Sequence, residues 1–290
     1  KIEVKSKKGV GTEVSIQLTL PIGDSEKIER FEESIAYKAL ENKRILLVED
    51  NEMNRSVAIN ALQPGKAIIT EAENGALALE ILKKEQFDLV LMDLQMPVMD
   101  GLQASKIIRE ELKLQLPIIA LTANAFKSEI DKCLAAGMNN YVTKPFEENE
   151  LIETIAKELG YSGKSVSSAK TPISAPSLHL YDLSKLKEMS RGNDEFVLKM
   201  LNLFVTTLPK NLDEMRVALL NKDLPSLKKL AHKLKPSLHN LGIKTYDDVR
   251  LLENYSEGNL NDSSYQELTE KIIHELSTCS SAIQKNELKG

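Results

Sequence analysis

The stretch Ile45-Leu46-Leu47-Val48-Glu49-Asp50-Asn51 decides the fold of the middle of the chain. It is a run of apolar residues followed at once by two acidic ones, which is typical of a buried strand that ends at a polar edge. The run Leu89–Met92 has the same form, because Asp93 follows it directly. Parallel strands bring their carboxyl ends to one rim of a sheet. The sequence therefore predicts Glu49, Asp50 and Asp93 close together on that rim.

The surrounding segment, residues 43–160, alternates strand and helix patterns. Regular alternation with short connections predicts a doubly wound α/β fold, a five-stranded parallel sheet with helices on both faces. The expected strands are Ile45–Val48, Ala67–Thr70, Leu89–Met92, Ile118–Leu121 and Tyr141–Thr143, and the expected helices are Met53–Leu62, Gly75–Lys84, Gly101–Glu111, Lys127–Ala136 and Glu148–Leu159.

The flanking segments have other patterns. Residues 1–24 read as a β-hairpin whose second strand ends at Pro21, and since a lone hairpin is only marginally stable we expect its partner strands N-terminal to this chain. A short charged helix, Glu26–Leu40, lies in an expected connector over residues 25–42. Residues 161–179 are rich in Ser and Pro and predict a flexible linker. Residues 180–290 predict an all-α helical bundle, with helices at Leu183–Met189, Asp194–Leu208, Leu212–Leu220, Leu224–Leu241, Thr245–Glu253 and Tyr265–Glu287.

Length and composition exclude several classes of protein. The 290 residues are enough for about two domains at ~150 residues each. The apolar runs are far shorter than the ~20 residues of a membrane-spanning helix, so we expect no membrane insertion of this segment. A net charge of −5 argues against general nucleic-acid binding. Two unrelated cysteines, Cys133 and Cys279, favour a reducing compartment. The chain starts at Lys1 without a signal peptide, and we expect it to be a piece of a longer protein.

Four of the five expected strand ends deliver a chemically matched set of side chains to one rim. Thr122 and Lys144 follow their strands as the three acids do. Three clustered carboxylates repel one another and call for a cation, and oxygen ligands suit Mg²⁺ or Mn²⁺. A nucleophilic carboxylate, a divalent cation, an ammonium and a hydroxyl together suit phosphoryl transfer. Each residue alone has an ordinary interpretation as a cap or a solvated group, but their coincidence at successive strand ends favours a site.

At this point the segment resembles a response-regulator receiver domain, which has a flavodoxin-like fold. The stretches that carry the resemblance are Ile45–Asn51, Leu91–Gly101, Ala120–Ala123 and Tyr141–Phe146. The resemblance implies that Asp93 is the phosphoacceptor and that Glu49, Asp50, Asp93 and the backbone carbonyl of Gln95 hold Mg²⁺. It also implies that Thr122 and Lys144 bind the phosphoryl group, that Tyr141 is the rotating aromatic of the output switch, and that Lys144–Pro145 is a cis peptide bond. Gln95 and Asn124 would tune the lifetime of the phosphate.

The predicted switch follows from the charge that phosphorylation adds at Asp93. Thr122 and its loop would move inward, and Tyr141 would turn into the vacated space. The face around Lys127–Ala136, Tyr141 and Glu148–Leu159 would then report the state of the site.

A histidine on a basic helix stands out in the helical segment. His232 lies one residue off an apolar stripe, among lysines that give residues 221–244 a positive charge. The stretch Ala231-His232-Lys233-Leu234-Lys235-Pro236-Ser237, followed by Leu241-Gly242, resembles the phosphoacceptor motif of histidine-containing phosphotransfer (HPt) domains. The resemblance implies that His232 carries the phosphoryl group, with Lys235 steadying it. Pro236 replaces the usual Gly and predicts a bend at the site. For His239 and His274 we expect ordinary packing or surface roles, and none for His179 in the linker.

The order of these segments resembles the C-terminal part of a hybrid sensor histidine kinase. Residues 1–24 resemble the end of the kinase ATPase domain, on a Gly-x-Gly-Thr stretch before a strand. The implied boundaries are 43–160 for the receiver and 180–290 for the HPt domain. As the phosphotransfer part of a transferase, the fragment lacks the ATP site and the kinase histidine and should not autophosphorylate. We expect it to be cytoplasmic, in a parent anchored in the cytoplasmic membrane.

The expected function is a phosphorelay in a two-component system. An upstream kinase histidine, expected in the same polypeptide, would donate to Asp93, and His232 would pass the group to a separate response-regulator receiver. Two alternatives remain open: a phosphorylation-controlled interaction module, and a phosphate sink. The sequence leaves open whether transfer occurs within or between chains.

Overall fold

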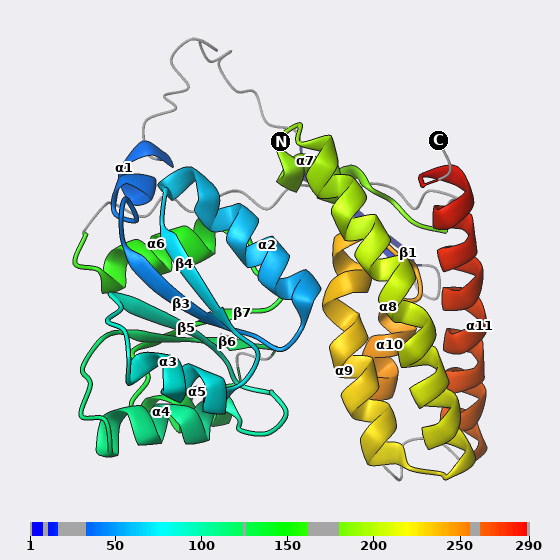
Figure 1. Ribbon diagram of the computed structural model, residues 1–290. Coiled ribbons are helices and arrows are strands. Elements are labelled where there is room, and N and C mark those ends of the chain that lie inside the picture. The colour runs from blue at the N-terminus through cyan, green and yellow to red at the C-terminus, as the bar shows by residue number, and fades with distance from the viewer. Residues whose placement is uncertain are drawn as a thin grey trace.

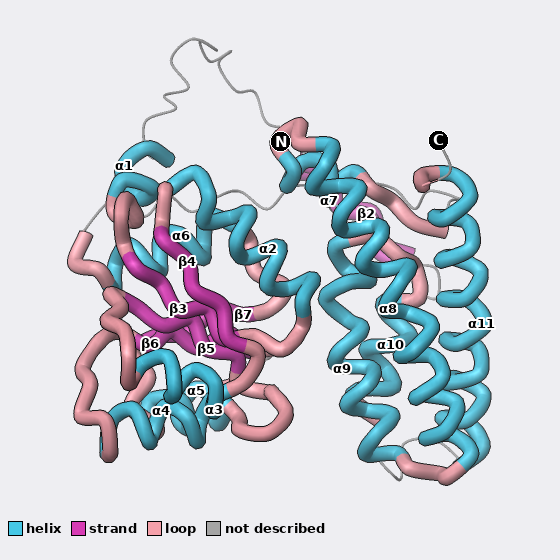
Figure 2. Tube along the Cα trace, in the orientation of Figure 1, coloured by secondary structure: helices cyan, strands magenta, loops and turns pink. Residues whose placement is uncertain are grey.

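The computed structural model describes residues 2–7, 11–16, 33–123, 126–161, 180–255 and 262–288. It contains an α/β part and a helical part that lie side by side (Figure 1). Within these described residues, strands occur only in the α/β part and in a small N-terminal hairpin, as the secondary-structure colouring of Figure 2 shows.

The α/β part is built on a five-stranded parallel sheet with strand order β4-β3-β5-β6-β7. Buried apolar side chains fill the three central strands, so β3 and β5 place the ends of their runs side by side at one rim. Strand β4 lies at the edge, where its side chains are largely accessible. The strands are β3 Arg44–Val48, β4 Ile68–Ala72, β5 Leu89–Asp93, β6 Ile118–Thr122 and β7 Asn140–Thr143. The predicted doubly wound fold is confirmed.

Helices cover both faces of this sheet (Figure 1). One face packs against α1, α2 and α6, and the other against α3, α4 and α5, which gives two separate apolar clusters. A short 3-10 helix, Gln63–Gly65, follows α2. The helices are α1 Glu33–Lys38, α2 Glu52–Leu62, α3 Gly75–Leu82, α4 Gly101–Glu110, α5 Lys127–Ala135 and α6 Glu148–Glu158.

The helical part consists of α7 Ser184–Ser190, α8 Asp194–Leu220, α9 Leu224–Asn240, α10 Tyr246–Glu253 and α11 Asp262–Asn286. The two helices predicted at Asp194–Leu208 and Leu212–Leu220 are wrong, because α8 runs through Pro209 without ending. The flanking apolar residues explain the continuity: Leu208 and Leu212 are both buried in the core of the bundle. Packing of a long apolar stripe therefore outweighs the backbone hydrogen bond that proline removes.

Helix α9 likewise continues through Pro236. It ends before Gly242, whose positive φ of 56° and close approach to Asp182 leave no room for a side chain. A Cβ there would lie 2.4 Å from the carbonyl oxygen of Asp182. The turn returns the chain as α10, which packs alongside α9.

At the N-terminus, β1 Ile2–Lys7 and β2 Gly11–Ile16 form the predicted antiparallel hairpin, with Val4 opposite Val14. The rest of the second predicted strand, residues 26–32 of the predicted helix Glu26–Leu40, Asn124 and residues 162–179 of the predicted linker lie outside the described residues.

The α/β and helical parts share an apolar cluster. Met53 and Val57 of α2 are 3% and 6% exposed and belong to the same buried cluster as the core of the bundle. Phe146, which precedes α6, packs against this cluster and against the sheet cluster. Helix α2 and Phe146 therefore provide the apolar part of the contact between the two parts.

Candidate functional site

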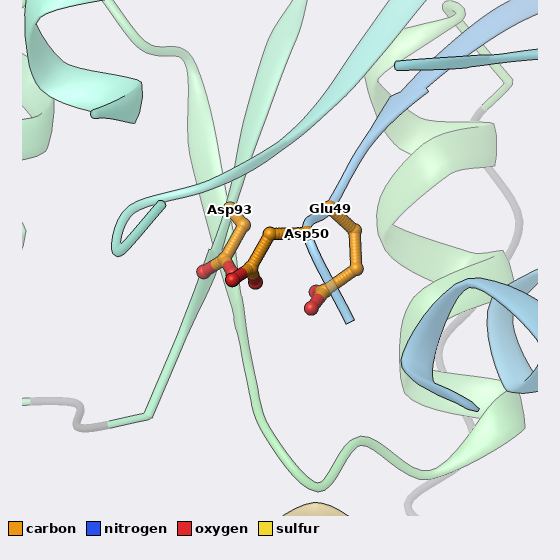
Figure 3. A group of neighbouring side chains, drawn as sticks. All are labelled: Glu49, Asp50 and Asp93. Atoms are coloured by element: carbon orange, nitrogen blue, oxygen red, sulfur yellow. The ribbon is translucent and has the colours of Figure 1, made fainter. Parts of the chain in front are cut away.

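Three acidic residues meet where β3 and β5 end. Asp93 is the last residue of β5, and Glu49 and Asp50 directly follow β3. Each offers a carboxylate oxygen within 4.8 Å of the others. In Figure 3 the side chains of Asp50 and Asp93 turn toward each other, with Glu49 beside them. Adjacent parallel strands in register bring these positions together, as the sequence predicts.

Glu49 is buried and held by several donors. Its Oε1 accepts a hydrogen bond from Asn54 Nδ2 at 2.8 Å and a longer one from the backbone N–H of Asn51. Its Oε2 lies 2.9 Å from Lys144 Nζ. Burial and the charge of Asp93 raise the pKa of Glu49, while Lys144 acts in the opposite direction. Glu49 is thus oriented by donors on α2 and its N-cap and by the lysine that follows β7.

Lys144 places a buried ammonium among these acids. Its Nζ lies 2.8 Å from Oδ1 of Asp93, and its side chain is only 6% exposed. Burial alone would lower the pKa of Lys144, but Glu49 and Asp93 outweigh it and raise the pKa. The Lys144–Pro145 peptide bond is cis, as expected. Thr122 is buried at the end of β6, and its carbonyl accepts a hydrogen bond from the backbone N–H of Lys144 at 2.6 Å.

The donor set fits a divalent cation. Burial and repulsion from Glu49 raise the pKa of Asp50. Three acids against one buried ammonium leave an excess of negative charge on oxygen ligands, which is the chemistry that Mg²⁺ prefers. The backbone N–H of Gln95 donates to Oδ1 of Asp93 at 3.2 Å, so the loop after β5 folds back onto the cluster.

Tyr141 lies on β7 and is half-buried. It packs against the apolar cluster on the α3–α5 face of the sheet. The helical part, in contrast, packs against α2.

A second cluster surrounds His232 on α9. The Nδ1 atom of His232 lies 2.7 Å from Oε1 of Glu253, and the other carboxylate oxygen lies 2.7 Å from Nζ of Lys235. Burial raises the pKa of Glu253, but the hydrogen bonds from His232 and Lys235 outweigh it and lower the pKa. Glu253 therefore bridges the two residues that the sequence singles out in this helix.

This bridge fixes the chemistry of the imidazole. A neutral ring that donates from Nδ1 to a carboxylate has its lone pair on Nε2. In that tautomer Nε2 carries the free lone pair of the ring, and Glu253 can stabilise positive charge on the ring.

Sequence reasoning did not identify Glu253. A signal was present, because the short turn between α9 and α10 makes them antiparallel neighbours, and His232 and Glu253 lie about equally far from that turn. Asn51 and Asn54 were missed as well. They belong to α2, where Asn51 caps the helix through hydrogen bonds from Met53 and Asn54.

The other histidines differ in their surroundings. His239 contacts the ring of Tyr246, and its Nε2 lies 2.7 Å from Lys185 Nζ. Burial and Lys185 lower the pKa of His239 to about 4. His274 is exposed on α11, and His179 lies outside the described residues.

Comparison with known proteins identifies two domains. Residues 45–156 match the response regulator receiver domain family, and residues 199–284 match the Hpt domain family. The chain thus carries a receiver domain and an Hpt domain, the class of modules that the sheet rim and the histidine-bearing bundle define.

Curated relatives that match large parts of the chain are sensor kinases. The chain is 32% identical to the sensor protein GacS of Pseudomonas syringae over 208 residues, which is 69% of this chain and 23% of GacS. It is 37% identical to the autoinducer 2 sensor kinase/phosphatase LuxQ of Vibrio harveyi over 157 residues, 52% of this chain and 18% of LuxQ. The chain therefore spans less than a quarter of the length of these relatives, and it is homologous to hybrid sensor kinases.

Among solved structures, the receiver domain of the sensor histidine kinase PA1611 of Pseudomonas aeruginosa, with magnesium in its active-site cleft, is 39% identical. The alignment covers 41% of this chain and 99% of that one, with a TM-score of 0.39. Among the residues that the structure describes, no helix has the length and apolarity needed to cross a membrane.

Proposed function

We propose that this chain carries a phosphorelay step in a two-component system. Asp93 receives a phosphoryl group from a kinase histidine, His232 takes it from Asp93, and a downstream response regulator takes it from His232. The observation that carries the proposal is the pairing of a buried Asp93–Lys144 contact with a histidine whose Nδ1 is held by Glu253.

In the first step, Oδ of Asp93 attacks the phosphorus of the phosphohistidine, the P–N bond breaks, and an acyl phosphate forms. Lys144 and Thr122 are assigned to the phosphoryl oxygens, because both are buried at neighbouring strand ends. A buried ammonium is effective there, since water screens its charge little.

Glu49, Asp50, Asp93 and the carbonyl of Gln95 are proposed to hold Mg²⁺, with Mn²⁺ as an alternative ion of similar preference. The bound ion would offset the negative charge of the phosphoryl oxygens. Of the three acids, Asp50 has the most accessible side chain, and Glu49 is already oriented by Asn54 and Lys144.

In the second step, Nε2 of His232 attacks the phosphorus, the P–O bond to Asp93 breaks, and the carboxylate is restored. The Nδ1 proton stays on the ring, which becomes cationic, and Glu253 stabilises that charge. Lys235 anchors Glu253 in the structure, and its proposed contact with the phosphoryl group belongs to the phosphorylated state.

We assign Tyr141 to the output switch, because it lies half-buried one strand beyond Thr122. Gln95 and Asn124 are proposed to tune the lifetime of the acyl phosphate.

The wider polypeptide is also a matter of proposal. We assign residues 1–24 to the end of a kinase ATPase domain, 25–42 to a connector, 43–160 to the receiver, 161–179 to a linker and 180–290 to the Hpt domain. The kinase core would belong to the same polypeptide, membrane-anchored and with these domains in the cytoplasm.

The test is a phosphotransfer assay with Asp93→Asn and His232→Gln in the full chain. Neither variant should deliver phosphate to a downstream receiver, and only His232→Gln should retain phosphate on the chain. Delivery by either variant would refute the relay order. Phosphate that stays on Asp93 in the wild-type chain would favour the interaction module, and rapid loss from Asp93 as inorganic phosphate would favour the sink.

A further inference from the structure

The receiver domain and the Hpt domain of this chain contact each other through helix α2 and its N-cap and through residues near the ends of α1, α6 and α7. Helix α2 has two apolar faces: Ala58, Ala61 and Leu62 pack toward the sheet, whereas Met53 and Val57 are buried among the helices of the bundle. Burial of this second face requires a partner, and in the structure the Hpt domain of the same chain is that partner.

Two amides of α2 and its cap fix the register of this contact. Asn60 Nδ2 donates to the carbonyl oxygen of Met189 at the end of α7 over 2.8 Å. Asn51 Nδ2 donates to the carbonyl oxygen of Lys233, the neighbour of His232, over 3.1 Å. The second bond therefore joins Asn51, which follows Asp50 in the receiver, to Lys233, which follows His232 in the Hpt domain.

A cluster of polar and charged side chains forms a second part of the contact, between α7 and the start of α6. The guanidinium of Arg191, at the end of α7, forms an ion pair with Glu148 at the start of α6, and the hydroxyl of Tyr37 donates to the same carboxylate. Arg191 also donates to the hydroxyl of Tyr37 over 3.0 Å. Three groups from α1, α6 and α7 therefore converge on one another.

A second ion pair lies at the same end of α6. Lys185 of α7 lies 3.2 Å from a carboxylate oxygen of Glu147 and also contacts Nε2 of His239 on α9. The pair Glu147–Glu148 thus faces the pair Lys185–Arg191 across the boundary between the domains.

We propose that Tyr37, Glu147, Glu148, Lys185 and Arg191 form a latch that holds the Hpt domain on the receiver of its own chain. This inference rests on the proposed relay. It specifies that Asp93 serves His232 of the same chain while the latch is closed, and that a second receiver reaches His232 only when the latch opens.

The position of the receiver explains why a second receiver would be excluded from His232 while the latch is closed. The carbonyl of Lys233, next to His232, accepts a hydrogen bond from Asn51, so the receiver of the same chain occupies part of the surface that flanks His232. Any other receiver must bring its acidic site to the same Nε2 atom. Complementary charges placed away from the reacting atoms are suited to control that choice, because they alter docking without altering chemistry.

Helix α1 belongs to the latch through Tyr37. This helix directly precedes the receiver and packs against α6. A change in the position of α1 therefore reaches the latch without passing through the carboxylate cluster.

The first experiment measures docking of the two domains in the absence of phosphate, by amide hydrogen exchange in the full chain. Arg191→Glu should raise exchange across α2 by about tenfold, as expected for loss of a charge-assisted contact. The swap Arg191→Glu with Glu148→Arg should restore protection. Arg216→Glu, at an exposed arginine of α8 that pairs within its own helix, should leave α2 unchanged. Unchanged exchange with Arg191→Glu, or no recovery in the swap, would overturn the latch.

The second experiment measures transfer between chains. Asp93→Asn chains, which keep His232, are mixed with His232→Gln chains, which keep Asp93, and acetyl phosphate is supplied. Adding Arg191→Glu to both should raise the rate of transfer to His232 about tenfold, because the Hpt domain and the receiver of each chain then separate and become accessible to the other chain. An unchanged rate would overturn the proposed exclusion. If His232 of the wild-type chain gained no phosphate, the relay itself would fail, whereas the exchange result would still decide the latch.

Discussion

The Nζ atom of Lys144 lies 2.8 Å from a carboxylate oxygen of Asp93, and both side chains are buried. The same ammonium reaches Glu49, so one lysine balances two buried acids before any phosphoryl group arrives. Because buried charges are tolerated only with partners, this contact links the stability of the receiver to its chemistry.

Replacing Lys144 by Gln should destabilise the receiver by about 3 kcal/mol, because Glu49 and Asp93 are left buried without a cation. Addition of Mg²⁺ should restore part of that loss, since an ion that binds only the folded state stabilises it. Denaturant unfolding with and without Mg²⁺ measures both effects. Lys66→Gln, at an exposed lysine, is the control and should change stability little. Equal stability of Lys144→Gln and wild type would show that Lys144 does not balance the buried charges of Glu49 and Asp93.

Replacing Glu253 by Gln should slow phosphate transfer onto His232 by about ten- to a hundredfold, the range for losing a hydrogen bond to a charged group. The amide can still occupy the space but no longer stabilises a cationic ring. Rapid-quench measurement of phosphohistidine gives the rate. Glu267→Gln, on the exposed surface of α11, is the matched control. If Glu253→Gln transferred phosphate at the wild-type rate, Glu253 would not stabilise the cationic ring of His232 as proposed.

Acidification should weaken the fold through His239. Its pKa in the folded chain is about 4, below the ordinary value of 6.5, so the unfolded chain takes up the proton more readily. The stability is therefore complete above pH 6.5 and falls as the pH drops toward 4. Between pH 7 and pH 5 the wild type should lose about 2 kcal/mol more than His239→Gln. Parallel pH profiles of the two proteins would show that His239 is not the group responsible.

Gly101 should not tolerate a side chain. A Cβ there would lie 2.1 Å from the carbonyl oxygen of Asp93, so α4 would have to move away from the end of β5. We expect Gly101→Ala to lower the free energy of unfolding by about 1–3 kcal/mol, as overpacking does, and to reduce phosphorylation of Asp93. Gly192→Ala, at a positive φ with open space around it, should lose about 1 kcal/mol and leave phosphorylation intact. Thermal unfolding and a phosphorylation assay separate the two cases.

The sheet and the carboxylate cluster could be predicted because their signals are local. Each apolar run is short and ends at a polar residue, and parallel topology fixes which ends are neighbours. The prediction of two helices within Asp194–Leu220 was wrong for a related reason, because the local pattern does not show that Leu208 and Leu212, near Pro209, are both buried in the bundle. The other predicted helices of residues 43–160 and 180–290 begin and end within about three residues of the observed ones.

Contacts between distant segments could not be read from periodicity. Glu253 was overlooked because its partner lies on another helix, and the pairing becomes visible only when α9 and α10 are placed side by side. The same holds for Met53 and Val57: their spacing predicts a buried face of α2, but not that another domain buries it.

Helix α2 packs one face on the sheet of the receiver and the other on the Hpt domain, and this has a consequence for signalling fidelity. Met53 and Val57 fit helices encoded in the same polypeptide, so the two surfaces are inherited together and always meet at high local concentration. A contact of modest intrinsic affinity then suffices to exclude the receivers of other pathways, and the same modest affinity allows release. Insulation from cross-talk in this chain thus comes from connectivity as much as from the contact itself.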